Sequence, residues 1–434
     1  MNKNVNKEPH IDIYANRSIL HKHDSLEVFD EGPQSDEARL RYEKINRVLE
    51  DGYLDQLMDE VREQGFKVEL PEDQRPIFNK LVEGISSNTG KALVGLSVVQ
   101  LTIKAICPEQ SIRLHKGSSS KRDFSWKEGV SMRSIDQAHV TPFLRNNDLL
   151  RMNAYGVMMT RTLAENYPYS DLYKAKLQGP REYWLMLVDG LETGTINAKA
   201  GLSYLLSLLL NKSEAFQKVC DEANDALRDA QNITRERMNR LIRRFLGETK
   251  HPARAFEIVM HSFMQAMFEL NHSEEYRLEP LSQMRSANKK HKNIGDIEIK
   301  TDDYVAESWD AKYRKPYLEE ELGELEDKLQ DFGVKVEVAG FVTDGKPEID
   351  DTIRSREDDL ANQFDIEVKI MSFEDWISYE MGMYPSVDEN QLMMHWLYAL
   401  VGSFSLQRPD MAPIDEPCDV WVEDLTKEIR RTFK

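Results

Sequence analysis

The strongest constraint on the fold is the order of elements that the sequence predicts between about residues 253 and 379. A helix with a broad apolar stripe at 253–270 precedes two short alternating segments, 294–301 and 304–313, which are typical of strands. The elements that follow are a helix at 316–333, a strand at 334–343, a helix at 356–365, a strand at 366–373 and a helix at 373–381. This order predicts a mixed α/β unit in which helices flank a mixed sheet of four to five strands.

The first half of the chain is expected to be mostly helical. Apolar residues recur at helical spacing among charges between 35 and 65, and the segment 89–106 is apolar on nearly all sides, as in a buried helix. The segment 112–147 is rich in Gly, Ser, Lys and Arg and predicts a loop with short elements. Long helices are expected again between 148 and 245, and a further apolar helix at 392–404 lies in the C-terminal tail.

Composition narrows the class of protein. Hydrophobic residues make up 40% and charged residues 31% of the 434 residues, which is typical of a globular protein. The chain has no apolar run near the ~18 residues that would span a bilayer, and its polar N-terminus does not resemble a signal peptide. We therefore expect a cytoplasmic protein that has no membrane contact.

The net charge of −19 argues against a protein that coats nucleic acid nonspecifically, but it is compatible with a DNA enzyme that has local basic surfaces. The three cysteines, Cys107, Cys220 and Cys418, are far apart and form no paired motif. Buried reduced thiols are predicted, and neither a disulfide scaffold nor a zinc site is expected. The histidines are scattered, with His21 and His23 on a polar N-terminal segment, and no H-E-x-x-H motif is present.

Acidic and basic residues of the two predicted strands have the spacing of a metal-dependent phosphodiesterase site. Asp296 opens the first strand, and Asp310 and Lys312 lie two residues apart on the second, so their side chains point to the same face. If the strands pair as a hairpin, Asp296 comes alongside. Magnesium prefers oxygen ligands, here Asp296, Asp310 and the carbonyl of Ala311, and the lysine would orient water and offset phosphate charge.

These residues resemble the PD-(D/E)xK nuclease superfamily, the fold of many type II restriction endonucleases. The first motif is Gly295-Asp296 rather than Pro-Asp, and the second is Asp310-Ala311-Lys312. The resemblance extends over about residues 253–379. It implies that a glutamate on the preceding helix faces the metal site, and Glu257 is the matching residue.

Two other interpretations of the same charges stay open. Glu298 and Lys300 form a rival E-x-K triplet on the first strand, although the apolar neighbours of Asp310 favour the second strand. All of these charges could also be solvated side chains of an ordinary sheet. Glu298 and Glu307 are expected to support or flank the site rather than to bind metal, and Glu257 could equally form a helix salt bridge.

DNA contacts are expected from two basic segments. The loop at 112–147 combines cations with small hydroxyl residues, which suit phosphate contacts, and the candidates are Lys116, Ser119, Lys121, Arg122, Lys127 and Arg133. A structured surface loop with solvated charges is the alternative. Lys289, Lys290 and Lys292 precede Asp296 and would lie at the mouth of the site. An arginine-rich helix at 234–247 could bind phosphate, although pairing with acidic residues is favoured.

The sequence thus predicts a helical N-terminal region (1–110), a helical region with a DNA-recognition loop (111–250) and a nuclease domain with a helical tail (251–434). The implied function is that of a type II restriction endonuclease, which hydrolyses both strands of a specific double-stranded DNA site with Mg²⁺. A homodimer is expected because two antiparallel strands must be cut, and a cognate DNA methyltransferase is expected as a genetic partner. The alternatives are another repair or defence nuclease and a noncatalytic DNA-binding protein with a nuclease-like fold.

Overall fold

The chain forms two compact units, Met1–Ala215 and Phe216–Lys434, whose boundary lies inside helix α8 (Ala198–Asp229). The computed structural model describes residues 8–22, 26–64, 69–85, 90–150, 152, 155–271, 275–281, 293–333, 335–405 and 418–433. The sequence placed its boundaries at 110 and 250 instead. The difference arises because Leu202 and Leu209 of α8 pack in the core of the first unit, whereas Leu227 packs in the core of the second.

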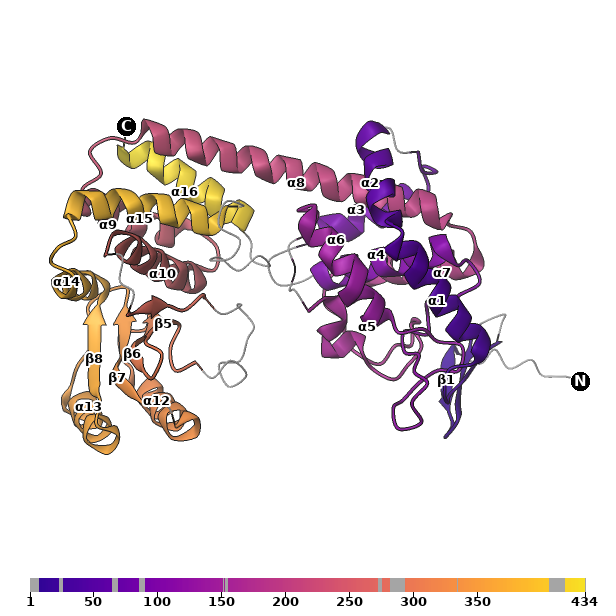
Figure 1. The fold of residues 1–434 in the computed structure, drawn as a ribbon, viewed down its shortest axis with the longest axis horizontal. Helices are drawn as coiled ribbons and strands as arrows, with labels where there is room; N and C mark the ends of the chain where they lie inside the picture. The colour runs from indigo at the N-terminus through magenta and orange to yellow at the C-terminus, as the bar shows by residue number, and fades with distance from the viewer. Residues whose placement is uncertain are drawn as a thin grey trace, which may run out of the picture. The chain divides into compact units, whose positions relative to one another are not determined.

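The first unit is mainly helical (Figure 1). Its helices are α1 (Asp36–Glu50), α2 (Tyr53–Gln64), α3 (Arg75–Glu83), α4 (Lys91–Ile106), α5 (Met132–Ile135), α6 (Thr141–Asn146), α7 (Arg181–Thr193) and the first part of α8. Helix α4 is buried along almost its whole length, as its apolar sequence predicts. The expected loop with short elements between 112 and 147 is also present.

The expectation of long helices from residue 148 onward is wrong for the first thirty residues or so of that stretch. Between α6 and α7 the described backbone is irregular, apart from short 3₁₀ turns at Val157–Met159 and Arg161–Leu163. Asp148, Gly156 and Gly179 all have positive φ, a conformation that a right-handed α-helix does not contain.

A small antiparallel sheet near the N-terminus was not predicted. It consists of β1 (His10–Ile13), β2 (Arg17–His21) and β3 (Leu26–Asp30) in that order. Its apolar contribution to the core is limited, since Leu20 and Phe29 are its buried members and pack with Leu114 and Trp126. A sheet with so few buried residues leaves a weak alternation in the sequence.

The second unit is built around the predicted mixed sheet. The order is β4 (Arg277–Leu278), β5 (Ile297–Lys300), β6 (Val305–Lys312), β7 (Val336–Thr343) and β8 (Glu367–Ser372). Strands β4, β5 and β6 pair antiparallel, and β6, β7 and β8 pair parallel. The β5–β6 ladder has an irregularity at Ile299/Lys300. The predicted hairpin of β5 and β6 is therefore correct, and the parallel pairs are connected through helices, as parallel strands require.

Helices cover both faces of this sheet (Figure 1). Those of the unit, besides the second part of α8, are α9 (Arg235–Glu248), α10 (Pro252–Asn271), α12 (Glu319–Phe332), α13 (Asp351–Phe364), α14 (Phe373–Met383), α15 (Glu389–Phe404) and α16 (Cys418–Phe433). Helices α12 and α13 pack with Phe341 on one face, whereas α10, α14 and α15 pack with Trp309 on the other. The expected helical tail contains α15 and α16, although no separate helix was placed at 418–433. The other helices overlap the segments where the sequence placed them, and α13 begins five residues earlier than expected.

Strand β6 directs Trp309 to one face of the sheet and the residues of the candidate site to the other. Trp309 points into the aromatic cluster that contains Phe263 of α10 and Trp376 of α14. Asp310 and Lys312 point to the opposite face, because side chains alternate along a strand. One strand thus fixes both the main core of the unit and the candidate site.

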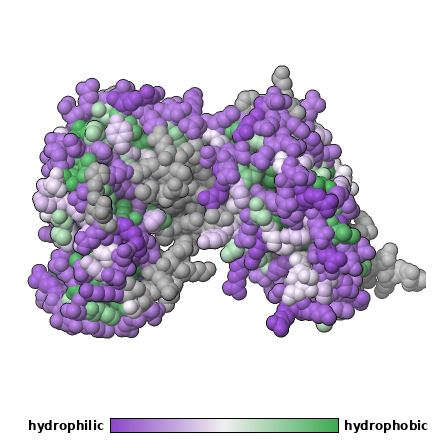
Figure 2. All heavy atoms as spheres, viewed as in Figure 1, coloured by the Kyte–Doolittle hydropathy of each residue, from purple (hydrophilic) through white to green (hydrophobic). Residues whose placement is uncertain are grey.

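The surface agrees with the composition. The face seen in Figure 2 is predominantly hydrophilic, with small and scattered hydrophobic patches. Within the described residues, no helix is both long and apolar enough to cross a membrane. The three cysteines are buried, as predicted.

Strands β6, β7 and β8 approach one another closely at Gly340, and this packing predicts how a side chain there would change the stability of the fold. A Cβ at this position would lie 2.2 Å from the carbonyl oxygen of Lys369 and 2.7 Å from the ring of Trp309. We expect Gly340→Ala to lower the free energy of unfolding by about 1–3 kcal/mol, as overpacked substitutions do, in urea denaturation. Gly323→Ala is the control, because a Cβ there meets nothing within 4 Å and the helix should gain stability. Equal stability of both variants would contradict the packing at Gly340.

Candidate active site

Asp310 and Lys312 form the centre of the candidate site. The Lys312 Nζ donates a hydrogen bond to Asp310 Oδ2 over 3.3 Å, and it also lies 5.7 Å from the ring centroid of Phe341. Asp310 is only 7% exposed. A carboxylate this deeply buried requires cationic or hydrogen-bonding partners, because water no longer solvates its charge.

Asp296 is brought beside this pair by the β5–β6 hairpin. Its backbone N–H donates to the carbonyl of Trp309 over 2.9 Å, and its Oδ2 accepts the N–H of Ala311 over 3.1 Å. The pairing of Ile297 with Trp309, extended by one residue, places Asp296 opposite Asp310. Ala311 therefore enters the site through its amide, and the role of its carbonyl as a metal ligand stays a prediction.

Glu257 reaches the same cluster from α10, which packs against β4, β5 and β6. Its carboxylate forms an ion pair with Arg254 and interacts electrostatically with Asp310 and Lys312. The helix salt bridge expected of Glu257 is thus present, and its support of a metal site stays a prediction. The four residues predicted from sequence, Asp296, Asp310, Lys312 and Glu257, gather in one cluster.

Burial and mutual repulsion give the carboxyl groups of the cluster different acidities. Burial, with repulsion from Glu257 and Asp310, raises the pKa of Asp296 well above its ordinary value. Burial also raises the pKa of Glu257. Burial opposes ionisation of Asp310 as well, but Lys312 and Lys328 outweigh it and lower the pKa of Asp310. The cluster therefore holds one firmly ionised carboxylate and two that a further cation would help to ionise.

Lys328 is a member of the site that the sequence did not indicate. From α12, its Nζ donates to Asp310 Oδ2 over 3.3 Å and to the carbonyl of Ile294 over 2.7 Å. It thus connects the carboxylate to the turn that carries Asp296. The sequence could have drawn attention to Lys328 through its position beside Leu325 and Leu329 on the apolar stripe of α12. That position predicts a lysine at the edge of the core, but it does not identify Asp310 as its partner.

Glu321, two turns nearer the start of α12 than Lys328, is a second addition. Its carboxylate is buried and forms an ion pair with Lys315. Burial lowers the pKa of Lys312, but attraction to Asp310 and, to a smaller extent, to Glu321 outweighs burial and raises it. The charged groups around Lys312 thus come from β6, from the turn before β5, from α10 and from α12.

The rival triplet Glu298-Ile299-Lys300 has a structural role. Glu298 Oε1 accepts the backbone N–H groups of Ile294 and Gly295 over 2.6 and 3.4 Å, and Lys300 Nζ lies 2.7 Å from Oε2. This pair holds the turn that carries Asp296. A side chain at Gly295 would lie 2.8 Å from the carbonyl oxygen of Trp309, which explains why glycine precedes Asp296. The expectation that Glu298 supports the site matches these contacts.

The predicted DNA-contacting residues that the structure describes belong to the first unit, whereas the cluster belongs to the second. Ser119, Lys121, Arg122, Lys127 and Arg133 are exposed, whereas Lys116 is half-buried. Lys116 contacts Asn166 and lies 5.6 Å from the ring centroid of Phe124, and Arg133 donates to the carbonyl of Met158 over 3.0 Å. Lys289, Lys290 and Lys292 lie outside the described residues.

An arginine-lined groove of about 770 Å³ lies on α9 in the same unit as the cluster. Arg235, Arg240, Arg243 and Arg244 line it together with Glu374 of α14. A smaller adjoining pocket, which shares Arg243 and Glu374, includes Tyr313, the residue after Lys312. Arg243 pairs with Glu374, while Arg240 and Arg244 have no acidic partner within the described residues. The expected pairing of the α9 arginines with acidic residues is therefore present for Arg243 but not for Arg240 or Arg244 within the described residues.

Comparison with known proteins adds no assignment: no protein-family model matches the chain, and no curated protein matches its sequence.

The raised pKa of Asp296 predicts how its removal changes stability with pH. Aspartate in the unfolded chain titrates near pH 3.9, so above that pH the folded protein holds a proton that the unfolded chain has lost. The free energy of unfolding therefore falls as pH rises from about 4 to the folded pKa. Asp296→Asn removes this loss and keeps an oxygen for the Ala311 amide.

We expect Asp296→Asn to gain stability relative to the wild type progressively as the pH rises above about 4, because the folded-state pKa of Asp296 is raised. Urea denaturation in the presence of a chelator measures this difference. Asp303→Asn, at an exposed position after β5, should leave the pH dependence unchanged. An equal stability difference at both ends of the pH range would show that Asp296 does not titrate as the structure implies.

Proposed function

We propose that the protein is a Mg²⁺-dependent endodeoxyribonuclease of the PD-(D/E)xK type, which cuts both strands of a specific double-stranded DNA site as type II restriction endonucleases do. The observation that carries the proposal is the convergence of Asp296, Asp310 and Lys312 at one buried site, although these residues lie on two different strand segments. Asp310 is only 7% exposed, which distinguishes this cluster from the solvated charges of an ordinary sheet.

The donor set fits a magnesium ion. Asp296 and Asp310 offer carboxylate oxygens, which are the ligands that this hard cation prefers. Glu257 interacts with both electrostatically, but the three carboxylates do not lie within 4.8 Å of one another as a group. The raised pKa values of Asp296 and Glu257 indicate a shortage of positive charge, which a divalent cation would relieve. When bound, the metal would supply Lewis-acid activation of the phosphate and of a water molecule. Lys312 would hold that water and stabilise the charge that develops on the phosphate.

The architecture around the site supports the same proposal. Helix α10, the β5–β6 hairpin, helix α12 and strand β7 follow one another in the order that the nuclease resemblance implies. The mixed sheet with helices on both faces presents the cluster at the end of β6 next to the start of β5. Because only one such cluster is proposed in each chain, cleavage of two antiparallel strands favours a twofold homodimer.

DNA binding is proposed for two surfaces. The arginine-lined groove on α9 adjoins a pocket that includes Tyr313, the residue after Lys312, so the groove lies near the end of β6 that carries the cluster. Arg240 and Arg244, which have no acidic partner in the part of the chain described, suit phosphate contacts. The exposed cations Lys121, Arg122 and Lys127 of the first unit are proposed to add contacts, as the sequence predicts.

One observation favours a second candidate, a noncatalytic DNA-binding protein with the same fold. Two ammonium groups, from Lys312 and Lys328, lie 3.3 Å from the same Asp310 oxygen. They already offset the charge that a metal would neutralise. This candidate predicts DNA binding with no magnesium-dependent cleavage, whereas a repair or defence nuclease without sequence specificity predicts cleavage at positions that depend on DNA structure.

Substitutions in the cluster test the catalytic proposal. Asp310→Ala removes a metal ligand, and Lys312→Ala removes the group that positions water, so each should lower the cleavage rate by at least about a hundredfold. Supercoiled plasmid of mixed sequence with Mg²⁺ is the substrate, and sequencing the ends reports site specificity. DNA binding in Ca²⁺, measured by gel shift, should change much less than cleavage.

A matched control comes from β8, where Glu367 and Lys369 have the same spacing and also form an ion pair. Glu367→Ala and Lys369→Ala should keep full cleavage, because their pair is not part of the cluster. If all four variants cleaved equally, the site assignment would be wrong. If the wild type bound DNA but did not cleave it, the noncatalytic candidate would replace the nuclease.

The groove on α9 generates a separate binding prediction. Replacement of both Arg240 and Arg244 by glutamine should weaken DNA binding and lower the slope of log affinity against log salt by up to about two. Arg228→Gln is the control, because this exposed arginine already pairs with Asp225. An unchanged salt dependence in the double variant would exclude the groove as a phosphate-binding surface.

A further inference from the structure

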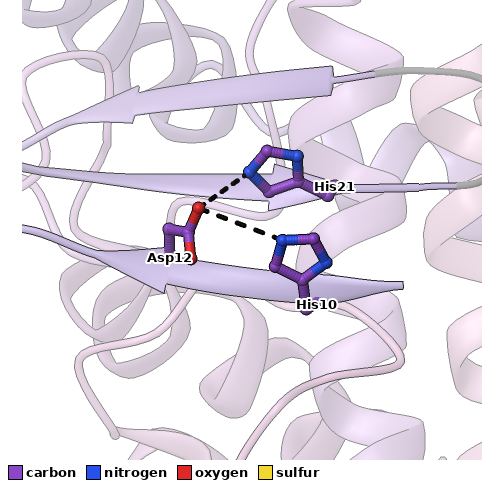
Figure 3. A group of neighbouring side chains, drawn as sticks. All are labelled: His10, Asp12 and His21. Carbon is purple, nitrogen blue, oxygen red and sulfur yellow. Dashed lines mark hydrogen bonds and ion pairs between the residues drawn. The ribbon is translucent and has the colours of Figure 1, made fainter. Parts of the chain in front are cut away.

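A group of metal-ligating side chains lies on the N-terminal sheet, in the other unit from the candidate active site. His10 and Asp12 lie on β1, and His21 lies on β2 (Figure 3). One ligand atom from each of these residues can be chosen so that all three lie within 4.8 Å of one another. In the described part of the chain, no other group of three or more His, Cys, Asp or Glu residues meets this condition.

The register of the hairpin produces the arrangement. His10 pairs directly with His21 across β1 and β2, and Asp12 follows His10 at the two-residue spacing that keeps side chains on one face. Asp12 and His21 are therefore diagonal neighbours, close enough for long side chains to meet. The imidazole rings stack at a centroid distance of 4.2 Å with an interplanar angle of 5°.

The potential ligand atoms are close to the spacing of a zinc coordination shell. Asp12 Oδ2 lies 3.0 Å from His21 Nε2 and 4.0 Å from His10 Nε2, and Figure 3 shows both rings directing a nitrogen toward this oxygen. Metal–ligand bonds of about 2.0–2.2 Å in tetrahedral geometry separate neighbouring ligands by about 3.3 Å. The two observed distances lie on either side of that value, and the stacked rings would have to turn out of their parallel planes to direct both nitrogen lone pairs at one ion.

A backbone contact orients one of the rings as metal-binding histidines usually are. The ring Nδ1 of His10 lies 2.9 Å from the carbonyl oxygen of Glu8. A carbonyl can only accept, so Nδ1 carries the proton, and in the neutral ring Nε2 keeps its lone pair on the side of Asp12. A ligating histidine typically donates its second nitrogen in this way to a carbonyl or carboxylate.

We propose that His10, Asp12 and His21 bind a divalent transition-metal ion, with zinc as the best fit. Two imidazoles and one carboxylate form the three-ligand set of open zinc sites, and water or a ligand from another molecule would occupy the fourth position. Imidazole nitrogen selects zinc, cobalt, nickel or copper over magnesium and calcium, which prefer oxygen. The bound ion would join β1 to β2 and is independent of the proposed nuclease function.

The alternative is a simple hydrogen-bonded cluster in which His21 and Asp12 form an ion pair. The protein contains a matched example of that arrangement. His395 Nδ1 lies 3.7 Å from Glu269 Oε2, and the exposure of its side chain, 38%, is close to the 37% of His10. No second histidine joins this pair in a group that could hold a metal, as far as the described residues show. His395 therefore serves as the control position.

The test is a titration of the full-length, untagged chain with Zn²⁺ by calorimetry, in excess Mg²⁺ so that sites of oxygen ligands are occupied. The wild type should bind one high-affinity Zn²⁺ per chain, and Co²⁺ should give the visible absorption of a low-symmetry site. His10→Gln and His21→Gln should each weaken binding by more than the roughly 10- to 100-fold effect of losing an outer-shell partner. His395→Gln should bind as the wild type does.

Thermal melting gives a second readout that does not depend on stoichiometry. Zn²⁺ should raise the Tm of the wild type and of His395→Gln, because a ligand that binds only the folded state stabilises it, but it should not raise that of His10→Gln. Far-UV circular dichroism checks that the variants are folded. High-affinity Zn²⁺ binding that survives in the double variant His10→Gln/His21→Gln would overturn the proposal, as would its absence from the wild type.

Discussion

Asp310 is a buried carboxylate held by two lysines, and the candidate site depends on this interaction. Lys312 comes from the same strand and Lys328 from α12, so the charge of Asp310 ties the sheet to the helix that covers it. Without both ammonium groups, burial would favour the neutral acid. The low pKa of Asp310 and the raised pKa of Asp296 have one common cause. The ammonium groups of Lys312 and Lys328 lie closer to the carboxylate of Asp310 than to that of Asp296.

Backbone hydrogen bonds provide most of the contacts that hold the candidate site in place. Asp296 is fixed by amide contacts with Trp309 and Ala311, and the turn before it is held by Glu298. These contacts use strand register rather than flexible side chains, and sites built on strands hold their geometry more accurately than sites on loops. The triplet Glu298-Ile299-Lys300 thus resembles a catalytic motif in sequence but positions one in the structure.

Sequence patterns located the mixed sheet, most of its helices and Asp296, Asp310 and Lys312, because strong periodicity and the spacing of Asp310 and Lys312 are local signals. Glu257 was implied by the nuclease resemblance alone. Lys328, the N-terminal sheet and α16 were missed. Lys328 becomes visible only when α12 is packed on the sheet, and the pairing of His10 with His21 requires the register of β1 and β2. The expectation of no zinc site was based on the spacing of the cysteines, and this spacing carries no information about histidines that pair across two strands. The helices expected between 148 and 180 failed because positive-φ residues interrupt them.

The alternation along β6 has a consequence for folding. A slip of one residue in its pairing would turn Asp310 into the aromatic core and Trp309 out of it, which is prohibitive in free energy. The irregularity of the hairpin ladder lies at Ile299/Lys300, toward the end of the pairing remote from Asp296 and Asp310, where it does not disturb their register. The core and the site therefore form in the same cooperative step. A nascent or partly unfolded chain lacks the assembled cluster, so whatever chemistry the site performs is withheld until folding of this unit is complete.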